Sequence, residues 1–534
     1  MCACAALFAQ GGQDASKSAA AVGVAGQDGP LAKYANPITI TVPAVIGANV
    51  FFAEGENFEK NFVTDMYRDK LNLDYKAKWT VDPAQSAEKM NLAIATNDLP
   101  DMFQVDAVTL GRLKMADQIE NLTSDYDKYT SGNLKKILEY QDKRGFLTGT
   151  FDGKLYGVPV SNDFANNLPL VHIRKDWLEK LGLKVPTTMD ELLAVARAFR
   201  DRDPDGNGKK DTISIALNKT LGSNAYTLKA LGNPLKAYYG IWVPKAGSLV
   251  YGSVQPEMKT ALKLMQDLYK EGIFDLEFAV KDDGKVAEDI AAGKIGIYPG
   301  VFWNSLWPLA GSLDVNPKAD WITIPLVADK DGKRGAQNTI FAYTWLVVRK
   351  GFSNPEALYK SMSLWYECFH GQYADMLNDM LSTPKYMPVA DNWHGNAKPQ
   401  FFSHPEKNLQ LSANYIEARK ANDPKLLKTG EARNRWALWQ KGGSQGWAHD
   451  TFLMVSEPQV SKYDYVAYNE FLGTPTENMA QRKATLDKLE YEAFVKIIMG
   501  APIDEFDAYV KKWKEQGGDL IAKDVNDWYK TVKK

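Results

Sequence analysis

Residues 38–105 decide the fold, because three apolar runs alternate there with two helical patterns. The runs read ITITV (38–42), LDYKAKWTV (73–81) and DMFQV (101–105), and their β-branched and aromatic residues are typical of strands. Between the runs, apolar residues recur at the spacing of one helix face: Phe58, Phe62 and Met66, then Ala87, Met90 and Ile94. This strand–helix–strand–helix–strand order predicts a parallel sheet with crossover helices.

The alternation continues along the rest of the chain. Thr188 and Glu191 have the spacing of a capping box, which predicts a helix start. A chain of 534 residues exceeds the size at which one core stops growing, so we expect two lobes. Further strands are predicted at 155–160, 294–298, 321–325 and 341–348, and helices from 476 onward with breaks at 500–502 and 517–518.

Composition excludes some classes of partner. Hydrophobic residues make up 45% and charged residues 24%, as in a soluble globular protein. With 64 basic and 66 acidic residues the net charge is −2, which argues against nucleic acid as a partner. Most of the 14 Trp, 25 Tyr and 22 Phe are expected in the core, but so many Trp leave some available for a binding cleft.

The N-terminal segment, MCACAALFAQGGQDASKSAAAVGVAGQDGP (1–30), is rich in Ala, Gly, Gln and Ser. We interpret residues 1–36 as a signal-peptide remnant and a disordered lipoprotein tether, with Cys2 or Cys4 as the lipidated residue. This hypothesis places the stated start inside a longer signal peptide; a disordered cytoplasmic leader is the alternative. Cys368, alone in the body of the chain, is expected to be a buried apolar residue.

Several stretches, in order along nearly the whole chain, resemble one family. They are DLPD (98–101), DGKLYGVP (152–159), RKDWLEKLGLKVPTT (174–188), DPDGNGKKD (203–211), GKIGIY (293–298), FVKIIMG (494–500) and VNDWY (525–529). The chain therefore resembles the extracellular solute-binding proteins (family 1) of carbohydrate ABC transporters, in particular the large lipoprotein branch that includes alginate-binding proteins.

The resemblance implies an α/β type II periplasmic-binding-protein fold, with two lobes joined by a hinge and the ligand cleft between them. We expect residues 37–162 and 340–400 in one lobe and 163–339 and 401–534 in the other. The implied function is the substrate-binding component of an ABC importer, which captures a carbohydrate outside the cytoplasmic membrane. The implied partners are permease subunits and, through a lipid anchor, the membrane; the chain is expected to be a monomer, and its length favours an oligosaccharide ligand.

A second site is predicted in residues 203–211, where oxygen-bearing side chains alternate along a Gly-containing loop. Asp203, Asp205, Asn207 and Asp211 would ligate a structural Ca²⁺ through their side chains, and Lys209 through its carbonyl. The Glu of an EF-hand's twelfth position is absent, because Ser214 stands there. A solvated Asp/Gly turn is the alternative reading.

Sugar sites combine aromatic rings, which stack on C–H faces, with polar side chains that bind hydroxyls. Trp and polar residues near predicted strand ends or crossings are therefore the candidates for ligand contact. For each of them, ordinary packing or a capped turn stays equally open. The candidates are Trp303, Trp393 and Trp307 for stacking, and Asn49, Asp106, Asn162 and Asp163 for hydrogen bonding.

We predict that the chain is not an enzyme. It has no G-x-S-x-G, H-E-x-x-H, P-loop or G-x-G-x-x-G signature. A secreted carbohydrate-active enzyme stays open, because 66 acidic residues always allow some pair of carboxylates. The same fold with a peptide or another solute as ligand is the second alternative.

Overall fold

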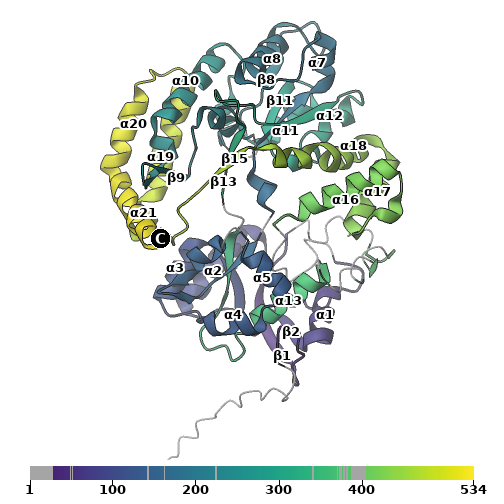
Figure 1. The fold of residues 1–534 in the computed structure, drawn as a ribbon, viewed down its shortest axis with the longest axis vertical. Coiled ribbons are helices and arrows are strands. Elements are labelled where there is room, and N and C mark those ends of the chain that lie inside the picture. Colours follow the sequence, from purple (N-terminus) through teal and green to yellow (C-terminus); the bar gives the residue numbers. More distant parts are fainter. Residues whose placement is uncertain are drawn as a thin grey trace, which may run out of the picture.

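The computed structural model describes residues 28–533, apart from 48–49, 51, 141–142, 162, 223–224, 340–341, 370, 372–375, 377–378, 381–382 and 387–404. Two α/β lobes lie one above the other along the long axis (Figure 1). None of the helices in the described ranges is long and apolar enough to cross a membrane.

The first lobe begins with the expected alternation. Strand β1 (Ile38–Val45) pairs in parallel with β2 (Leu73–Val81). Helix α1 (Phe62–Leu71) connects them, and it begins at the capping box of Asn61 and ends at Asn72, whose φ is 62°. Helix α2 (Pro83–Thr96) follows.

The prediction of one parallel sheet through the third strand is wrong. Strand β3 (Met102–Val105) pairs antiparallel with β14 (Ala342–Val348), which pairs on its other edge with β6 (Val158–Ser161). The partner β14 arrives from 240 residues further along the chain, so local alternation cannot reveal it. Asp101 still links β3 to β1, since its carboxylate accepts the backbone N–H of Thr41 at 2.8 Å.

The rest of the first lobe consists of helices and a short hairpin around this sheet. Cys368 is buried here, as expected. The remaining elements are α3 (Ala107–Met115), α4 (Thr123–Tyr129), α5 (Gly132–Leu138), α6 (Arg144–Gly149), β4 (Thr150–Phe151), β5 (Lys154–Leu155) and α13 (Ala357–Phe369).

The second lobe is built on a four-stranded sheet in the order β12–β7–β11–β8. Its strands are β7 (Leu170–Arg174), β8 (Ile213–Ile215), β11 (Ile295–Gly300) and β12 (Trp321–Pro325). Helix α8 (Met189–Asp201) begins at the predicted capping box of Thr188 and Glu191. Trp177 and Phe199 pack on β11 at Gly296, where any Cβ would lie within 2.7 Å of both rings.

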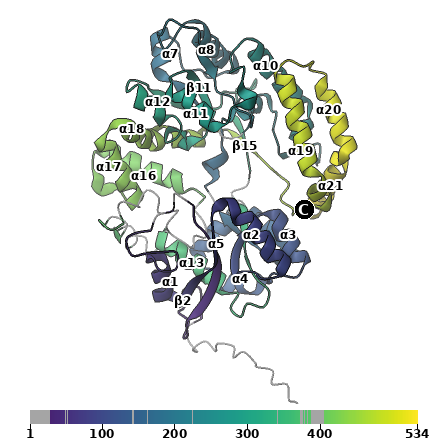
Figure 2. The same cartoon turned by 180° about the vertical axis from the view of Figure 1, so that it is seen from behind.

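Helices flank this lobe on two opposite sides, a placement on which both views agree (Figure 2). The breaks predicted at 500–502 and 517–518 are confirmed, with Gly517 at φ 110°. One side holds α16 (Lys407–Ala421), α17 (Gly430–Lys441) and α18 (Gly443–Thr451); the other holds α19 (Glu477–Ile498), α20 (Glu505–Trp513) and α21 (Asp519–Val532). Within the lobe lie α7 (Lys175–Leu181), α9 (Thr227–Gly232), β9 (Trp242–Lys245), β10 (Ser248–Tyr251), α10 (Pro256–Lys270), α11 (Asp283–Ala291) and α12 (Ala310–Val315).

The chain crosses between lobes through segments held by side-chain hydrogen bonds. Beyond β6 it passes through the 3-10 helix η1 (Phe164–Asn167) into β7, and it returns from β13 (Gly335–Asn338) to β14. Strand β13 pairs in parallel with β15 (Tyr465–Tyr468). Asn338 Nδ2 donates to the carbonyl of Phe164 at 2.8 Å, so the two crossings are joined.

A buried acid lies close to the first crossing. Glu457 opens the 3-10 segment η9 (Glu457–Lys462), is 0% exposed, and neither of its carboxylate oxygens accepts a hydrogen bond from a described residue. Burial raises the pKa of Glu457 to about 9, and the charge of Asp163 adds to the rise. The carboxyl is therefore neutral in the folded chain at pH 7.

We expect Glu457→Gln to reduce the loss of stability at alkaline pH. Between about pH 4.5 and pH 9 the folded state holds a proton that the unfolded state has released, so stability falls as pH rises. The amide of the variant does not titrate. From pH 6 to pH 9, the free energy of unfolding of the wild type should therefore fall by about 1 kcal/mol or more relative to that of the variant. Denaturant unfolding at both pH values measures it. Glu88→Gln, at an exposed site, is the control, and equal losses in all three proteins would contradict the prediction.

Candidate ligand-binding site

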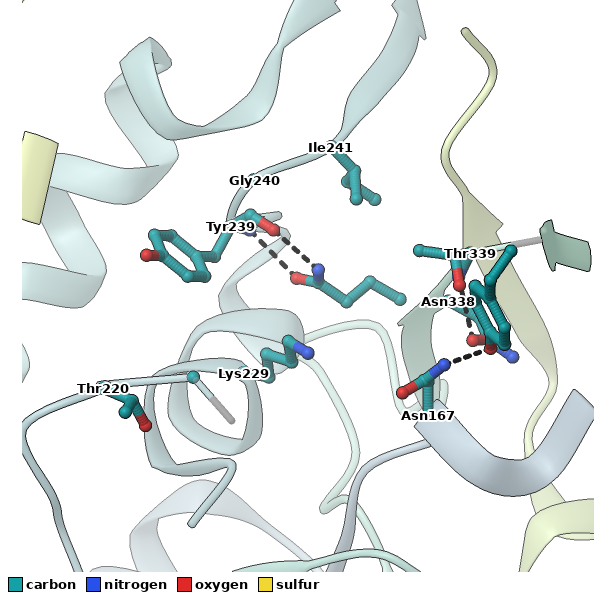
Figure 3. Close-up of a pocket in the computed structure, with 11 residues that line it drawn as sticks. Asn167, Thr220, Lys229, Tyr239, Gly240, Ile241, Asn338 and Thr339 are labelled. Carbon is teal, nitrogen blue, oxygen red and sulfur yellow. Dashed lines mark hydrogen bonds between the residues drawn. The ribbon is translucent and has the colours of Figure 1, made fainter. Parts of the chain in front are cut away.

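A pocket of about 480 Å³ opens where the crossing segments meet the second lobe (Figure 3). Residues from both crossings line it, together with the segment before α9, α9 itself and the turn that precedes β9. The lining residues are Asn167, Thr220, Gly222, Lys229, Tyr239, Gly240, Ile241, Gln337, Asn338, Thr339 and Tyr343.

Gln337 fixes one wall of the pocket. Its side-chain oxygen accepts the backbone N–H of Tyr239 at 2.9 Å, and its side-chain nitrogen donates to the Tyr239 carbonyl at 2.8 Å. Asn233 Nδ2 donates to the same Gln337 oxygen at 3.0 Å. The Tyr239 ring packs directly against Gly222, where a Cβ would lie 3.0 Å from the ring. The side-chain amide of Gln337 thus holds the backbone of Tyr239 in place in this wall.

The opposite wall consists of the crossing segments. Tyr343, 37% exposed, accepts a hydrogen bond from Asn167 Nδ2 on η1, and Tyr226 donates to Asn167 Oδ1 at 3.2 Å. The hydroxyl of Thr339 is buried and has no hydrogen-bond partner among the described residues. The wall therefore combines an accessible aromatic ring with a buried hydroxyl.

The charge of the pocket comes from one lysine. Lys229 is half-buried, its ammonium lies 4.2 Å from the centroid of the Tyr226 ring, and burial lowers its pKa to about 8. The lining residues of the described chain include no Asp or Glu. The arrangement offers rings, amides, hydroxyls and one cation, which suits a polar ligand with apolar faces.

The structure places the sequence candidates in other settings. Trp303 lies half-buried on the 3-10 helix η5 (Phe302–Ser305) against the second-lobe core, and Trp307 is 44% exposed. Asp106 caps α3 by accepting the N–H of Thr109 at 2.7 Å. None of the three lines the pocket, so their ligand contacts stay predictions.

Asp163, 2% exposed, works as a structural cap between elements. Its carboxylate accepts the backbone N–H groups of Ala165 and Asn408, each at 2.9 Å, and so ties η1 to the start of α16. A ligand contact of Asp163 also stays a prediction. Asn49, Asn162 and Trp393, like Cys2 and Cys4, lie outside the described residues.

The sequence analysis missed most of the pocket. Tyr343 belongs to the predicted strand 341–348 at the return crossing, so a search for any aromatic residue there would have found it. Lys229 and Tyr239 carry no motif, and only the folded chain brings them beside Gln337 and Asn338.

The predicted calcium loop folds around the side chain of Asn207. Its amide donates to Asp205 at 2.8 Å and to Asp211 at 3.0 Å, and its oxygen accepts the N–H of Lys209 at 2.7 Å. The carboxyls of Asp203 and Asp205 are close enough to hydrogen-bond each other. Carboxylate and amide oxygens are the donors that Ca²⁺ prefers, so the residues fit the ion by chemistry. Over the described ranges, however, no group of three or more His, Cys, Asp or Glu is arranged to hold a metal.

Known proteins resemble the chain along most of its length. Lipoprotein LipO of Bacillus subtilis (strain 168) is 23% identical over 483 residues, covering 86% of this chain and 87% of the relative. The polygalacturonan/rhamnogalacturonan-binding protein YtcQ of the same organism is 26% identical over 482 residues, 86% of each chain.

Solved structures share the fold. The solute-binding protein associated with an HMO-binding ABC transporter from Bifidobacterium longum infantis superimposes with a TM-score of 0.65 at 18% identity, covering 93% of this chain and 99% of the other. FusA of Streptococcus pneumoniae in complex with kestose gives 0.58 at 20% identity, covering 93% and 100%. The family model of the bacterial extracellular solute-binding proteins matches residues 52–364, more than half of the sequence. The chain, with two α/β lobes and a polar pocket at their crossings, belongs to this family.

Proposed function

We propose that the chain is the substrate-binding component of an ABC importer, which captures an oligosaccharide in the pocket at the crossings and delivers it to permease subunits. The observation that carries the proposal is the pocket itself, where Tyr239 and Tyr343 offer ring faces and Asn167, Thr220 and Lys229 offer polar groups. Relatives named for polygalacturonan and fructooligosaccharide binding support a carbohydrate as the ligand.

We propose that binding leaves the ligand intact. Most glycoside hydrolases place two carboxyl groups roughly 5–9.5 Å apart around the scissile bond. The described lining residues supply amides, hydroxyls, rings and one ammonium, a set suited to recognition. This chemistry favours capture by lobe closure over hydrolysis.

We further propose that the chain works outside the cytoplasmic membrane as a monomer, anchored by lipid on Cys2 or Cys4. Membership of an extracellular family supports the location, and the name of LipO supports the anchor. Mass spectrometry of the mature N-terminus addresses the anchor directly: an unmodified Met1 contradicts it.

Titration calorimetry against a panel of neutral and acidic oligosaccharides should find a ligand that binds one molecule per chain. Small-angle scattering of the complex should show a smaller radius of gyration, because the lobes close on the ligand. Chromatography of the released ligand should recover it at its original length. Shortened products would favour the enzyme, and a panel in which no saccharide binds would contradict the carbohydrate.

In the same titrations, Tyr343→Ala should weaken binding about 10-fold, since a lost ring face costs roughly 1.5 kcal/mol. The 37% exposure of Tyr343 predicts little change in melting temperature. Trp307→Ala removes a similarly exposed ring, 44%, that lies outside the pocket lining, and its affinity should stay close to wild type. If Trp307→Ala weakens binding and Tyr343→Ala does not, Trp307 is the stacking residue.

We propose that the loop of residues 203–211 binds a structural Ca²⁺, held by the side chains of Asp203, Asp205, Asn207 and Asp211 and the carbonyl of Lys209. A relative studied as an "EF-hand mutant" supports the idea that such loops occur in this fold. The ion would screen the convergent carboxylates and pin the loop beyond α8.

Calcium should therefore raise the melting temperature of the wild-type chain after chelator treatment, by a few degrees. Asp205→Asn should reduce this gain, whereas Asp69→Asn, at an exposed position of α1, should preserve it. Differential scanning calorimetry with chelator, with Ca²⁺ and with Mg²⁺ measures the effect. A melting temperature that does not respond to Ca²⁺ in the wild type would contradict the site.

A further inference from the structure

We propose that the pocket recognises an acidic saccharide, whose carboxylate pairs with the ammonium of Lys229; this inference rests on the proposed function. The pocket holds one cation, and its described lining residues include no anion to neutralise it. A uronic acid provides one carboxylate per sugar ring, which matches a single lysine among hydroxyl and amide groups.

The first step of the argument is the missing counter-ion. Two half-buried lysines elsewhere in the described chain are paired: Lys281 with Asp275 and Asp289, and Lys407 with Glu431. The buried Lys360 stacks on the Tyr34 ring at 4.2 Å and is influenced by the charge of Glu356. Lys229 forms no ion pair and no side-chain hydrogen bond with any described residue. Holding a charged group away from water without a partner is costly, so an unpaired lysine in a pocket indicates that a ligand supplies the negative charge.

The second step is the geometry around the ammonium. The side chain of Lys229 extends from α9 into the space between Tyr239 and the side formed by Asn167 and Asn338 (Figure 3). The Tyr226 ring centroid lies 4.2 Å from Nζ, and Lys229 also lines the pocket. A carboxylate placed there would keep its sugar ring within the same pocket as Tyr239 and Tyr343.

The third step concerns the groups that share this environment. Tyr226, Tyr239 and Tyr343 are the titratable groups that line or adjoin the pocket beside Lys229, and burial raises the pKa of each. They remain neutral through pH 9, so among the described lining residues Lys229 is the group that changes its charge near pH 8. Glu490, whose charge acts on Tyr239 from α19, has a pKa of about 7 and is ionised above that pH. Affinity for an acidic ligand should therefore decline as pH rises above 8, because the ammonium loses its proton.

The test uses matched pairs of saccharides. Oligomers of galacturonate, mannuronate, guluronate and glucuronate are titrated into the full chain by calorimetry, each beside its carboxyl-reduced, neutral counterpart. We expect at least one acid to bind 10-fold or more tighter than its reduced form. Lys229→Met should abolish that preference, so that the acid and its reduced form bind the variant with similar affinity.

Two further variants distinguish the effect of the charge at position 229 from the effect of removing any positive charge from the protein. Lys229→Arg should retain the preference for the acid and keep it at pH 9.5, where the wild type loses it. Lys263→Met, which removes a lysine paired with Asp267 on α10, should behave as wild type. A circular-dichroism melt of each variant excludes misfolding as the cause.

The outcomes distinguish the two proposals. If a neutral oligosaccharide binds and every acid binds no better, or if Lys229→Met keeps the preference for the acid, the assignment to Lys229 is overturned while the proposed function stands. If sulfated oligosaccharides, titrated in the same way, bind and uronates do not, the assignment of a carboxylate as the bound group is overturned. If no saccharide of any kind binds, the proposed function itself is overturned.

Discussion

Backbone that runs between two lobes leaves its sheet and loses ladder partners, and the rest of this structure depends on how those polar groups are satisfied. Side chains meet the requirement here. Asn338 binds the carbonyl of Phe164, Asp163 binds the N–H groups of Ala165 and Asn408, and Gln337 binds both backbone groups of Tyr239. Each buried group left unpaired would cost about 1–3 kcal/mol, so these few side chains determine where the crossings lie.

The same amides shape the candidate ligand site. Gln337 and Asn338 belong to β13, so the residues that hold the crossing together also carry the pocket wall. A displacement of one lobe therefore changes the distance between Tyr343, on the returning strand, and Tyr239, in the second lobe. Lys229 lies between these walls and forms no ion pair with a described residue, so the proposed preference for an acidic ligand does not require motion of the lobes.

Local patterns in the sequence predicted local structure well. The capping box of Thr188 and Glu191, the strands at 294–298 and 321–325 and the breaks in the C-terminal helices depend on neighbours within a few residues, and the structure confirms them. The pairing of β3 with β14 and the meeting of Lys229, Tyr239 and Tyr343 depend on contacts between distant segments. Trp303 shows a second limit of sequence-based prediction. A Trp that follows a strand is equally compatible with ligand contact and with core packing, and here it packs on the core.

The segment that follows β15 has a mechanical consequence. Thr148, at the end of α6, donates to the carbonyl of Leu472 at 2.7 Å and accepts from Thr474 at 3.2 Å, while Arg144 pairs with Glu470 at 2.7 Å. The first lobe is thus fastened at a second place, away from β6 and β14, by the chain that leads into α19. Two separated attachment points between the lobes define an axis. The lobes can rotate about this axis, but rotation in other directions is resisted, so this architecture suppresses twisting of one lobe against the other.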